Sequence, residues 1–96
     1  MIGKKHISNG QIIFACCDDE LLNTKISFEN ITIEINEGFY GITIMSQKEI
    51  LKNINEADSI NVFGKKTCSF LIDNKIISKD QIIYFGGIPH IQIYKL

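Results

Sequence analysis

One thiol and one imidazole in this chain have neighbours that suit nucleophilic catalysis. Cys17 directly precedes the acids Asp18–Glu20, a pattern typical of the first turn of a short helix, and His90 follows the single proline. A helix N-terminus lowers the pKa of a thiol, and a histidine can act as its base. The adjacent acids oppose this effect, because negative charge disfavours the thiolate. The alternative interpretation makes Cys17 a small buried residue between a strand and a helix.

The clustered acids, lysines and cysteines indicate little further chemistry. Consecutive acids such as Asp18–Glu20 rarely point at one ion, and the dipole of a helix explains them without a ligand. Lys65 and Lys66 follow Gly64, which suits either phosphate contact or a solvated turn, but the spacing of a P-loop is missing. The three cysteines include an adjacent pair and no C-x-x-C, which is atypical of disulfide frameworks and zinc sites. We therefore expect no metal and no cofactor.

The best candidate contact surface follows the segment Gly86–Pro89. Two glycines free the backbone there and the proline then fixes its φ, so the histidine that follows is held in a defined place. Side chains alternate along a strand, so His90, Gln92 and Tyr94 should share one face. The plainer interpretation of His90 is a histidine that is hydrogen-bonded to local backbone.

Four further residues complete the predicted contact surface. Tyr40 belongs to a Phe-Tyr pair that suits either an aromatic platform or the edge of a core. Asn61 suits a contact or a capped backbone turn. Lys65 and Lys66 lie at the margin of the predicted surface.

Composition limits the class of protein. The chain has 96 residues, which predicts one domain over residues 1–96, and a net charge of −1. All ten basic residues are lysine, which argues against strong DNA binding because arginine is the side chain best suited to phosphate and guanine. No signal peptide or bilayer-length apolar run is present, so we expect a cytoplasmic protein that does not enter membranes.

Strand signals dominate the pattern, helped by 21 isoleucines. Asn9-Gly10 between apolar runs predicts a type I′ hairpin near the N-terminus. Residues 31–36 alternate so that three isoleucines should face inward, and residues 42–44 suit another brief strand. Residues 82–85 and 91–94 suit a final antiparallel pair joined by a wide Gly-Gly-Ile-Pro turn.

Helix signals are fewer. Ser46 and Glu49 form a capping box, and the helix that they begin places Ile50, Leu51 and Ile54 on one stripe. Residues 66–73 suit a second helix that ends at Asn74, after a short buried strand over residues 61–63. The predicted class is α+β: a small two-layer domain with a mainly antiparallel sheet, an N-terminal hairpin, two or three short helices and a C-terminal strand pair.

Four blocks of the chain resemble one archaeal family, the domain of unknown function 424. Cys17–Leu22 is similar to its CDEELL block, Phe39–Gly41 to FYG, Asn61–Gly64 to NLVG, and Gly87–Ile93 to GVPHAQV. The blocks occur in the family's order over almost the whole chain. The resemblance implies a cytosolic archaeal α+β protein with a link to translation, and no known activity.

We therefore predict a small, non-enzymatic binding module whose partner is a protein or ribonucleoprotein, either the ribosome or a translation factor. The first alternative is a small hydrolase or transferase that uses Cys17 and His90. The second is a structural homo-oligomer joined through an exposed strand edge. The sequence leaves the oligomeric state open.

Overall fold

A five-stranded sheet forms the centre of the protein, and the computed structural model describes residues 1–95. The strands are β1 (Ile2–Ser8), β2 (Gln11–Cys17), β3 (Lys25–Phe28), β4 (Ile31–Glu34), β5 (Ser59–Phe63), β6 (Ile83–Phe85) and β7 (Ile88–Tyr94). The helices are α1 (Glu37–Tyr40), α2 (Gln47–Glu56) and α3 (Lys65–Asp73), with short 3₁₀ turns η1 (Asp19–Leu21) and η2 (Lys79–Gln81).

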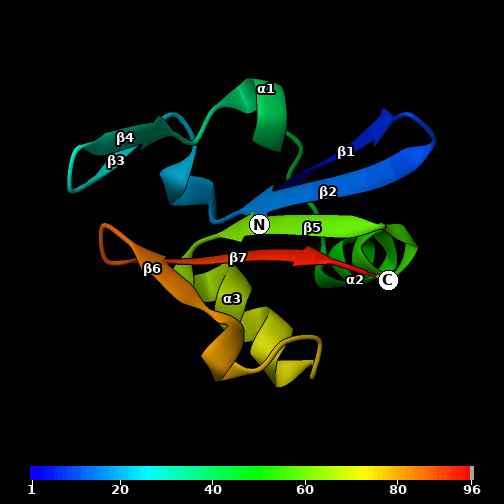
Figure 1. Ribbon diagram of the computed structural model, residues 1–96. Coiled ribbons are helices and arrows are strands. Elements are labelled where there is room, and N and C mark those ends of the chain that lie inside the picture. Colours follow the sequence, from blue (N-terminus) through cyan, green and yellow to red (C-terminus); the bar gives the residue numbers. More distant parts are fainter. Residues whose placement is uncertain (96) are drawn as a thin grey trace.

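The strand order of the sheet is β1-β2-β5-β7-β6. Only β2 and β5 run parallel; the other neighbours are antiparallel. Helices α2 and α3 cover one face, which we call the helical face (Figure 1). Helix α1 and the β3–β4 hairpin lie over part of the opposite face, which we call the hairpin face. The predicted α+β class, with a mainly antiparallel sheet and helices packed on it, is confirmed.

Each face of the sheet has its own apolar cluster. On the helical face, Phe14 and Val62 of the sheet pack with Ile50 and Ile54 of α2 and Leu71 of α3. On the hairpin face, the buried residues come from the sheet, from α1 and from the hairpin; they are Ile2, Ala15, Cys17, Ile26, Ile35, Tyr40 and Phe63. Because the inner strands are covered on both faces, they are nearly continuous apolar runs.

Local signals in the sequence placed several elements correctly. Asn9 and Gly10 both have positive φ, 51° and 77°, as the predicted type I′ turn between β1 and β2 requires. The capping box at Ser46 and Glu49 begins α2, with both reciprocal hydrogen bonds present. The helix predicted over residues 66–73 is α3, which ends at Asn74.

Three local predictions were wrong. Ile31 is 56% exposed, because β4 pairs only with β3 and lies at the margin of the hairpin face. Residues 42–44 form no strand; Ile44 makes one isolated bridge to Ile2. The turn between β6 and β7 is narrow rather than wide: Gly86 and Gly87 alone form it, and the proline lies inside β7.

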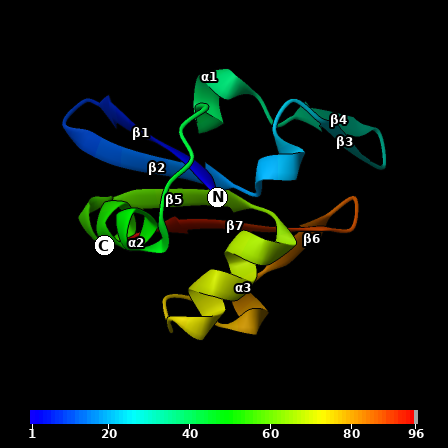
Figure 2. The ribbon, with the colours of Figure 1, turned by 180° about the vertical axis from the view of Figure 1, so that it is seen from behind.

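The segment between α1 and α2 crosses from the hairpin face to the helical face along the outer side of β1 (Figure 2). It is held there by backbone hydrogen bonds, Gly3 N–H to the oxygen of Thr43 at 3.2 Å and Met45 N–H to the oxygen of Met1 at 2.9 Å. Within residues 1–95, no helix is both long and apolar enough to cross a membrane.

Candidate functional site

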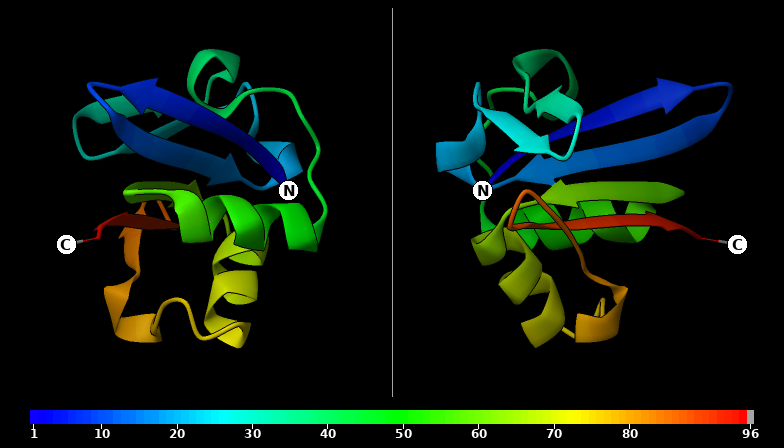
Figure 3. Two further views of the ribbon diagram at one scale, coloured as in Figure 1. Left: turned by 90° about the vertical axis from the view of Figure 1, so that its right-hand side faces the viewer. Right: turned by 60° about the vertical axis from the view of Figure 1, so that its left-hand side comes forward.

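The chain leaves the two parallel strands in opposite directions. Strand β2 ends at Cys17 and leads to η1 and the hairpin face, whereas β5 ends at Phe63 and leads to α3 on the helical face (Figure 3). Adjacent parallel strands whose connections diverge in this way leave a crevice outside their carboxyl ends, which is where open α/β sheets bind ligands.

Such a crevice of about 510 Å³ is present at this end of the sheet. Its walls come from η1 and the residue before it, from the start of α3, and from β6 and β7; the residues are Asp18, Glu20, Leu21, Lys65, Tyr84, Gly87, Ile88 and Pro89. Three of the four blocks that carry the family resemblance meet here, because Lys65 directly follows the Asn61–Gly64 block. Two other depressions, of about 470 and 440 Å³, lie elsewhere on the surface.

Asp18 fixes the floor of the crevice. Its side chain is 5% exposed and accepts three hydrogen bonds: from Lys66 N–H at 3.0 Å, Thr67 N–H at 2.8 Å and the Thr67 hydroxyl at 2.7 Å. Helix α3 begins after Gly64, which has no side chain to cap it, so Asp18 satisfies the free amides of the first turn from another element.

The other two acids of the block have separate partners. Asp19 lies 2.7 Å from the amino group of Met1, and Glu20 lies 3.2 Å from the ammonium of Lys66. Glu20 raises the pKa of Lys66 through this contact. Lys65 lines the crevice, and within residues 1–95 its ammonium makes no ion pair. Lys65 and Lys66 are therefore neighbours with different surroundings.

His90 lies inside the protein, at 9% exposure. Its Nδ1 donates a hydrogen bond to the carbonyl oxygen of Val62 at 2.8 Å, and its ring stacks on Phe63 with centroids 3.9 Å apart. Burial lowers the pKa of His90, and the hydrogen bond to Val62 opposes this shift in part. His90 is bonded to backbone, but to that of the neighbouring strand β5 rather than to the local backbone that we considered. Its ring is part of the framework behind the crevice.

The geometry disfavours Cys17 as a nucleophile. Its side chain is fully buried, and burial, helped by Asp18, raises the pKa of the thiol to about 12. Cys17 pairs with Phe63, which in turn pairs with His90, so thiol and imidazole are two strand spacings apart, roughly 9–10 Å. The ring of Phe63 stacks on the imidazole, and no hydrogen bond joins the thiol to it.

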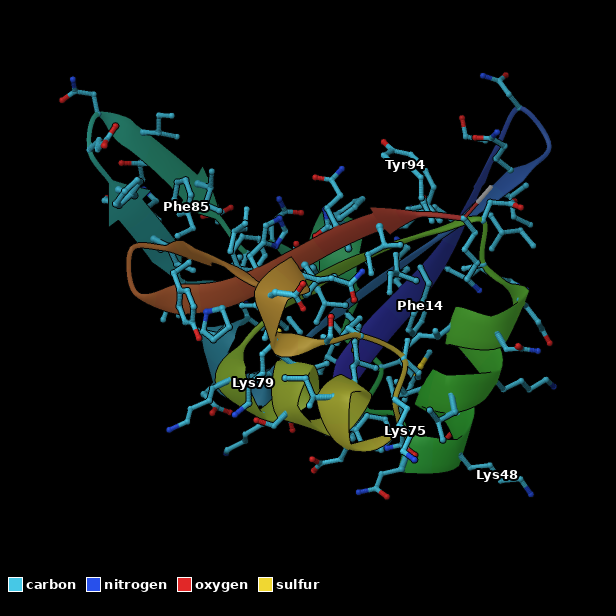
Figure 4. The ribbon with its side chains drawn as sticks, turned by 60° about the horizontal axis from the view of Figure 1, so that its bottom comes forward. Phe14, Lys48, Lys75, Lys79, Phe85 and Tyr94 are labelled. Carbon is cyan, nitrogen blue, oxygen red and sulfur yellow. The ribbon has the colours of Figure 1, made fainter. Side chains whose placement is uncertain are left out.

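Tyr40 is also buried, at 3% exposure, and its hydroxyl donates to Oδ1 of Asn61 at 2.7 Å. The pair joins α1 to the centre of the sheet. Gln92 and Tyr94 are exposed on the hairpin face, and Tyr94 is 70% exposed. Figure 4 shows Tyr94 and Phe85 toward opposite ends of the sheet. The structure thus separates the exposed Gln92 and Tyr94 from Lys65 and Lys66 at the crevice.

Three apolar residues of the crevice were not among the predicted site residues: Leu21, Tyr84 and Ile88. Leu21 and Ile88 lie within recognised blocks, but nothing in their spacing shows that the blocks meet. Tyr84 lies outside every block, in a run of four apolar residues, Ile82–Phe85. An aromatic residue in a run without any charge was the one available signal for it.

The fold and the crevice define a class of small α+β domains with a ligand-sized crevice where two parallel strands end. The chain belongs to the family described as "Protein of unknown function (DUF424)", whose profile matches residues 6–96. A solved structure titled "Crystal structure of an uncharacterized conserved protein from Methanopyrus kandleri" has 29% identity and a TM-score of 0.85. The match covers 99% of this chain and 90% of that one. No curated protein matches the chain. The resemblance inferred from the four blocks is confirmed.

Proposed function

We propose that the chain is a small, non-enzymatic binding module whose contact site is the crevice. The observation that carries this proposal concerns the crevice. The motif blocks meet there, and the acidic groups and the thiol beside it are already hydrogen-bonded, paired or buried. Asp18 accepts three hydrogen bonds, Glu20 is paired with Lys66, and the thiol of Cys17 is buried. The apolar walls and the ammonium of Lys65, which makes no ion pair within residues 1–95, suit the holding of a ligand better than its chemical conversion.

The partner that we propose is a cytoplasmic protein or ribonucleoprotein of the translation machinery, either the ribosome or a translation factor. The support is the resemblance of the motif blocks to an archaeal family, together with a charge balance that suits a local contact. Ten lysines nearly balance eleven acids, so binding through bulk electrostatics to nucleic acid is disfavoured.

Co-sedimentation with ribosomal particles from an archaeal lysate tests the proposal. Wild-type protein should sediment with a ribosomal subunit or an assembled ribosome. Lys65→Glu should lose most of this co-sedimentation, because it reverses the charge of the Lys65 side chain in the crevice. Lys48→Glu is the matched control, since Lys48 is an exposed lysine of α2 that does not line the crevice, and it lies on the other side of the protein from Phe85 of β6 (Figure 4). Wild-type protein that never sediments, or equal loss with both variants, would contradict the proposal.

A further inference from the structure

The two edge strands of the sheet differ in how well they are protected from pairing with another chain. The edge strand β1 carries Lys4 and Lys5, and residues 43–45 occupy part of its outer side through backbone hydrogen bonds. Charge and coverage are the usual means by which proteins protect an edge strand from pairing with another chain. Strand β6, at the other edge, carries no charged side chain. Strand β3 packs against its end at Phe85 and the following turn, but within residues 1–95 no strand pairs with its outer side.

Strand β6 consists of Ile83, Tyr84 and Phe85, with no charge, proline or bulge. Ile83 is 60% exposed and Tyr84 is 64% exposed. Large apolar side chains on an unprotected edge are a ready template for an added strand.

The backbone of Tyr84 is oriented for such pairing. Tyr84 lies opposite Pro89, and the carbonyl oxygen of Pro89 accepts a hydrogen bond from Gly64 N–H at 2.9 Å. The carbonyl of Pro89, which has no backbone N–H, therefore faces β5, so Tyr84 and Pro89 form a non-hydrogen-bonded pair. It follows that the N–H and C=O of Tyr84 point away from the sheet, toward the open edge.

The open edge and the crevice are contiguous, because Tyr84 belongs to both. Side chains of an added strand would alternate between the two faces of the sheet. Those on the helical face would lie beside Tyr84 and Pro89, two residues of the crevice wall, with the ammonium of Lys65 in the same crevice.

We propose that an extended segment of a partner protein adds as a strand to β6, places an apolar side chain in the crevice and sets a carboxylate against Lys65. This inference deepens the proposed function and rests on it. Main-chain pairing at Tyr84 supplies affinity, whereas the crevice and Lys65 select the sequence of the segment, as in other cases of strand addition.

Two other occupants fit the surface less well. A second copy of β6 presents the run Ile82–Phe85, which has no acid to meet Lys65. RNA offers no peptide N–H or C=O to pair with the edge of a sheet. A protein segment that combines apolar residues with an acid satisfies both the edge and the crevice.

The test uses a displayed library of random peptides, each about ten residues long so that it can span a strand of about five. Three variants are compared with the wild type. Tyr84→Pro removes the outward N–H and is tolerated because proline fits edge strands whose N–H faces solvent. Tyr84→Thr keeps the N–H and removes the ring, and Lys65→Glu reverses the charge. Thermal melting of each variant establishes that it is folded.

Selection on wild-type protein should enrich peptides that have apolar residues at alternate positions and that also carry an acidic residue. Their affinity should fall at least about tenfold for Tyr84→Pro and for Lys65→Glu, and less for Tyr84→Thr, because the removed interactions are each worth about one hydrogen bond or ion pair. Binding should also slow hydrogen exchange at the amide of Tyr84.

Several outcomes would overturn the inference. One is enrichment of no peptide that depends on Tyr84 and Lys65. A second is self-association in a dilution series by light scattering that Tyr84→Pro abolishes, which would assign the edge to a second copy. A third is binding of a single-stranded RNA oligomer that Lys65→Glu abolishes while no peptide binds. Ribosomal co-sedimentation that survives Tyr84→Pro would leave the proposed function intact and reject only the strand addition.

Discussion

The carboxyl group of Asp18 lies directly against the α-carbon of Gly64. A Cβ atom placed on Gly64 would come within 2.2 Å of Cγ of Asp18, and Gly64 has a φ of 122°, which L side chains rarely adopt. Asp18 follows β2 and Gly64 follows β5, so the contact joins the ends of the two parallel strands. Two motif blocks that lie 46 residues apart in the sequence therefore form one structural unit beneath the crevice.

This contact predicts strong coupling between Asp18 and Gly64. Gly64→Ala should destabilise the protein by about 3 kcal/mol, because it adds backbone strain and a collision with the Asp18 carboxyl. Asp18→Ala should cost about 2–3 kcal/mol, since the buried donors of Thr67 lose their acceptor. In the Asp18→Ala background the collision is absent, so Gly64→Ala should cost only about 1–2 kcal/mol of strain. Urea denaturation of the four proteins measures the cycle, and additive costs would refute the contact.

The two glycines of the β6–β7 turn differ in their surroundings. A Cβ on Gly86 would lie 2.6 Å from the carbonyl oxygen of Ser27 in β3, whereas a Cβ on Gly87 would meet nothing within 4 Å. Both have positive φ, 58° and 81°, so backbone strain is similar in the two. Gly86→Ala should therefore cost about 1–3 kcal/mol more than Gly87→Ala, the range for overpacking.

Hydrogen exchange locates the effect of Gly86→Ala. Loss of the close approach should loosen the β3–β4 hairpin from the turn, so amides of Lys25–Phe28 should exchange faster than in Gly87→Ala. Equal exchange in the two variants would show that the hairpin does not depend on this contact.

The sequence predicted those features of the fold that depend on neighbouring residues. Asn9-Gly10 specified the turn between β1 and β2, because both residues adopt the positive φ that a type I′ turn requires. Ser46 and Glu49 specified the start of α2 through their reciprocal hydrogen bonds. Ile31 shows the limit of this reasoning. Alternation correctly indicated a strand, but whether a strand face is covered depends on where the strand packs, and β4 pairs only with β3.

The candidate site was only partly predictable for the same reason. The sequence indicated Lys65 and the segment around Pro89 separately, but only the parallel pairing of β2 with β5 brings them to one crevice. His90 was correctly placed on one strand face with Gln92 and Tyr94. Its burial follows from Phe63 on the neighbouring strand, which no spacing along the chain reveals.

The three thiols should be unreactive at neutral pH. Burial is the main cause that raises the pKa to about 12 for Cys16 and Cys17 and to about 11 for Cys68. A raised pKa leaves less thiolate, which is the reactive form, so alkylation by iodoacetamide should be at least about 100-fold slower than for a model thiol with a pKa of about 8.5. Mass spectrometry of native and urea-unfolded protein measures the rates. A native Cys17 that reacts as fast as the model thiol would restore the enzymatic alternative.

His90 should make the protein less stable in mild acid. Burial lowers its pKa in the folded state, so the unfolded chain binds the proton more readily. The stabilisation that depends on neutral His90 is therefore complete above the unfolded pKa, about 6.5, and is lost as the pH falls through the folded pKa. His90→Asn keeps a donor near Val62 and cannot titrate. Its free energy of unfolding should thus be lower than that of the wild type at about pH 7.5, through lost stacking on Phe63, and should fall less between about pH 7.5 and 5.5.

The control for His90→Asn is Gln92→Asn, two residues further along β7 and exposed on the same face. It changes no titrating group, so its stability should fall with acid as steeply as that of the wild type. Urea denaturation at the two pH values compares the slopes. If His90→Asn keeps the full wild-type slope, the loss of stability in acid has another source, because His90→Asn removes the titrating imidazole whereas Gln92→Asn keeps it. A reduced slope in His90→Asn alone would show that burial keeps the ring stacked on Phe63 neutral in the folded protein, against the opposing effect of its hydrogen bond to Val62.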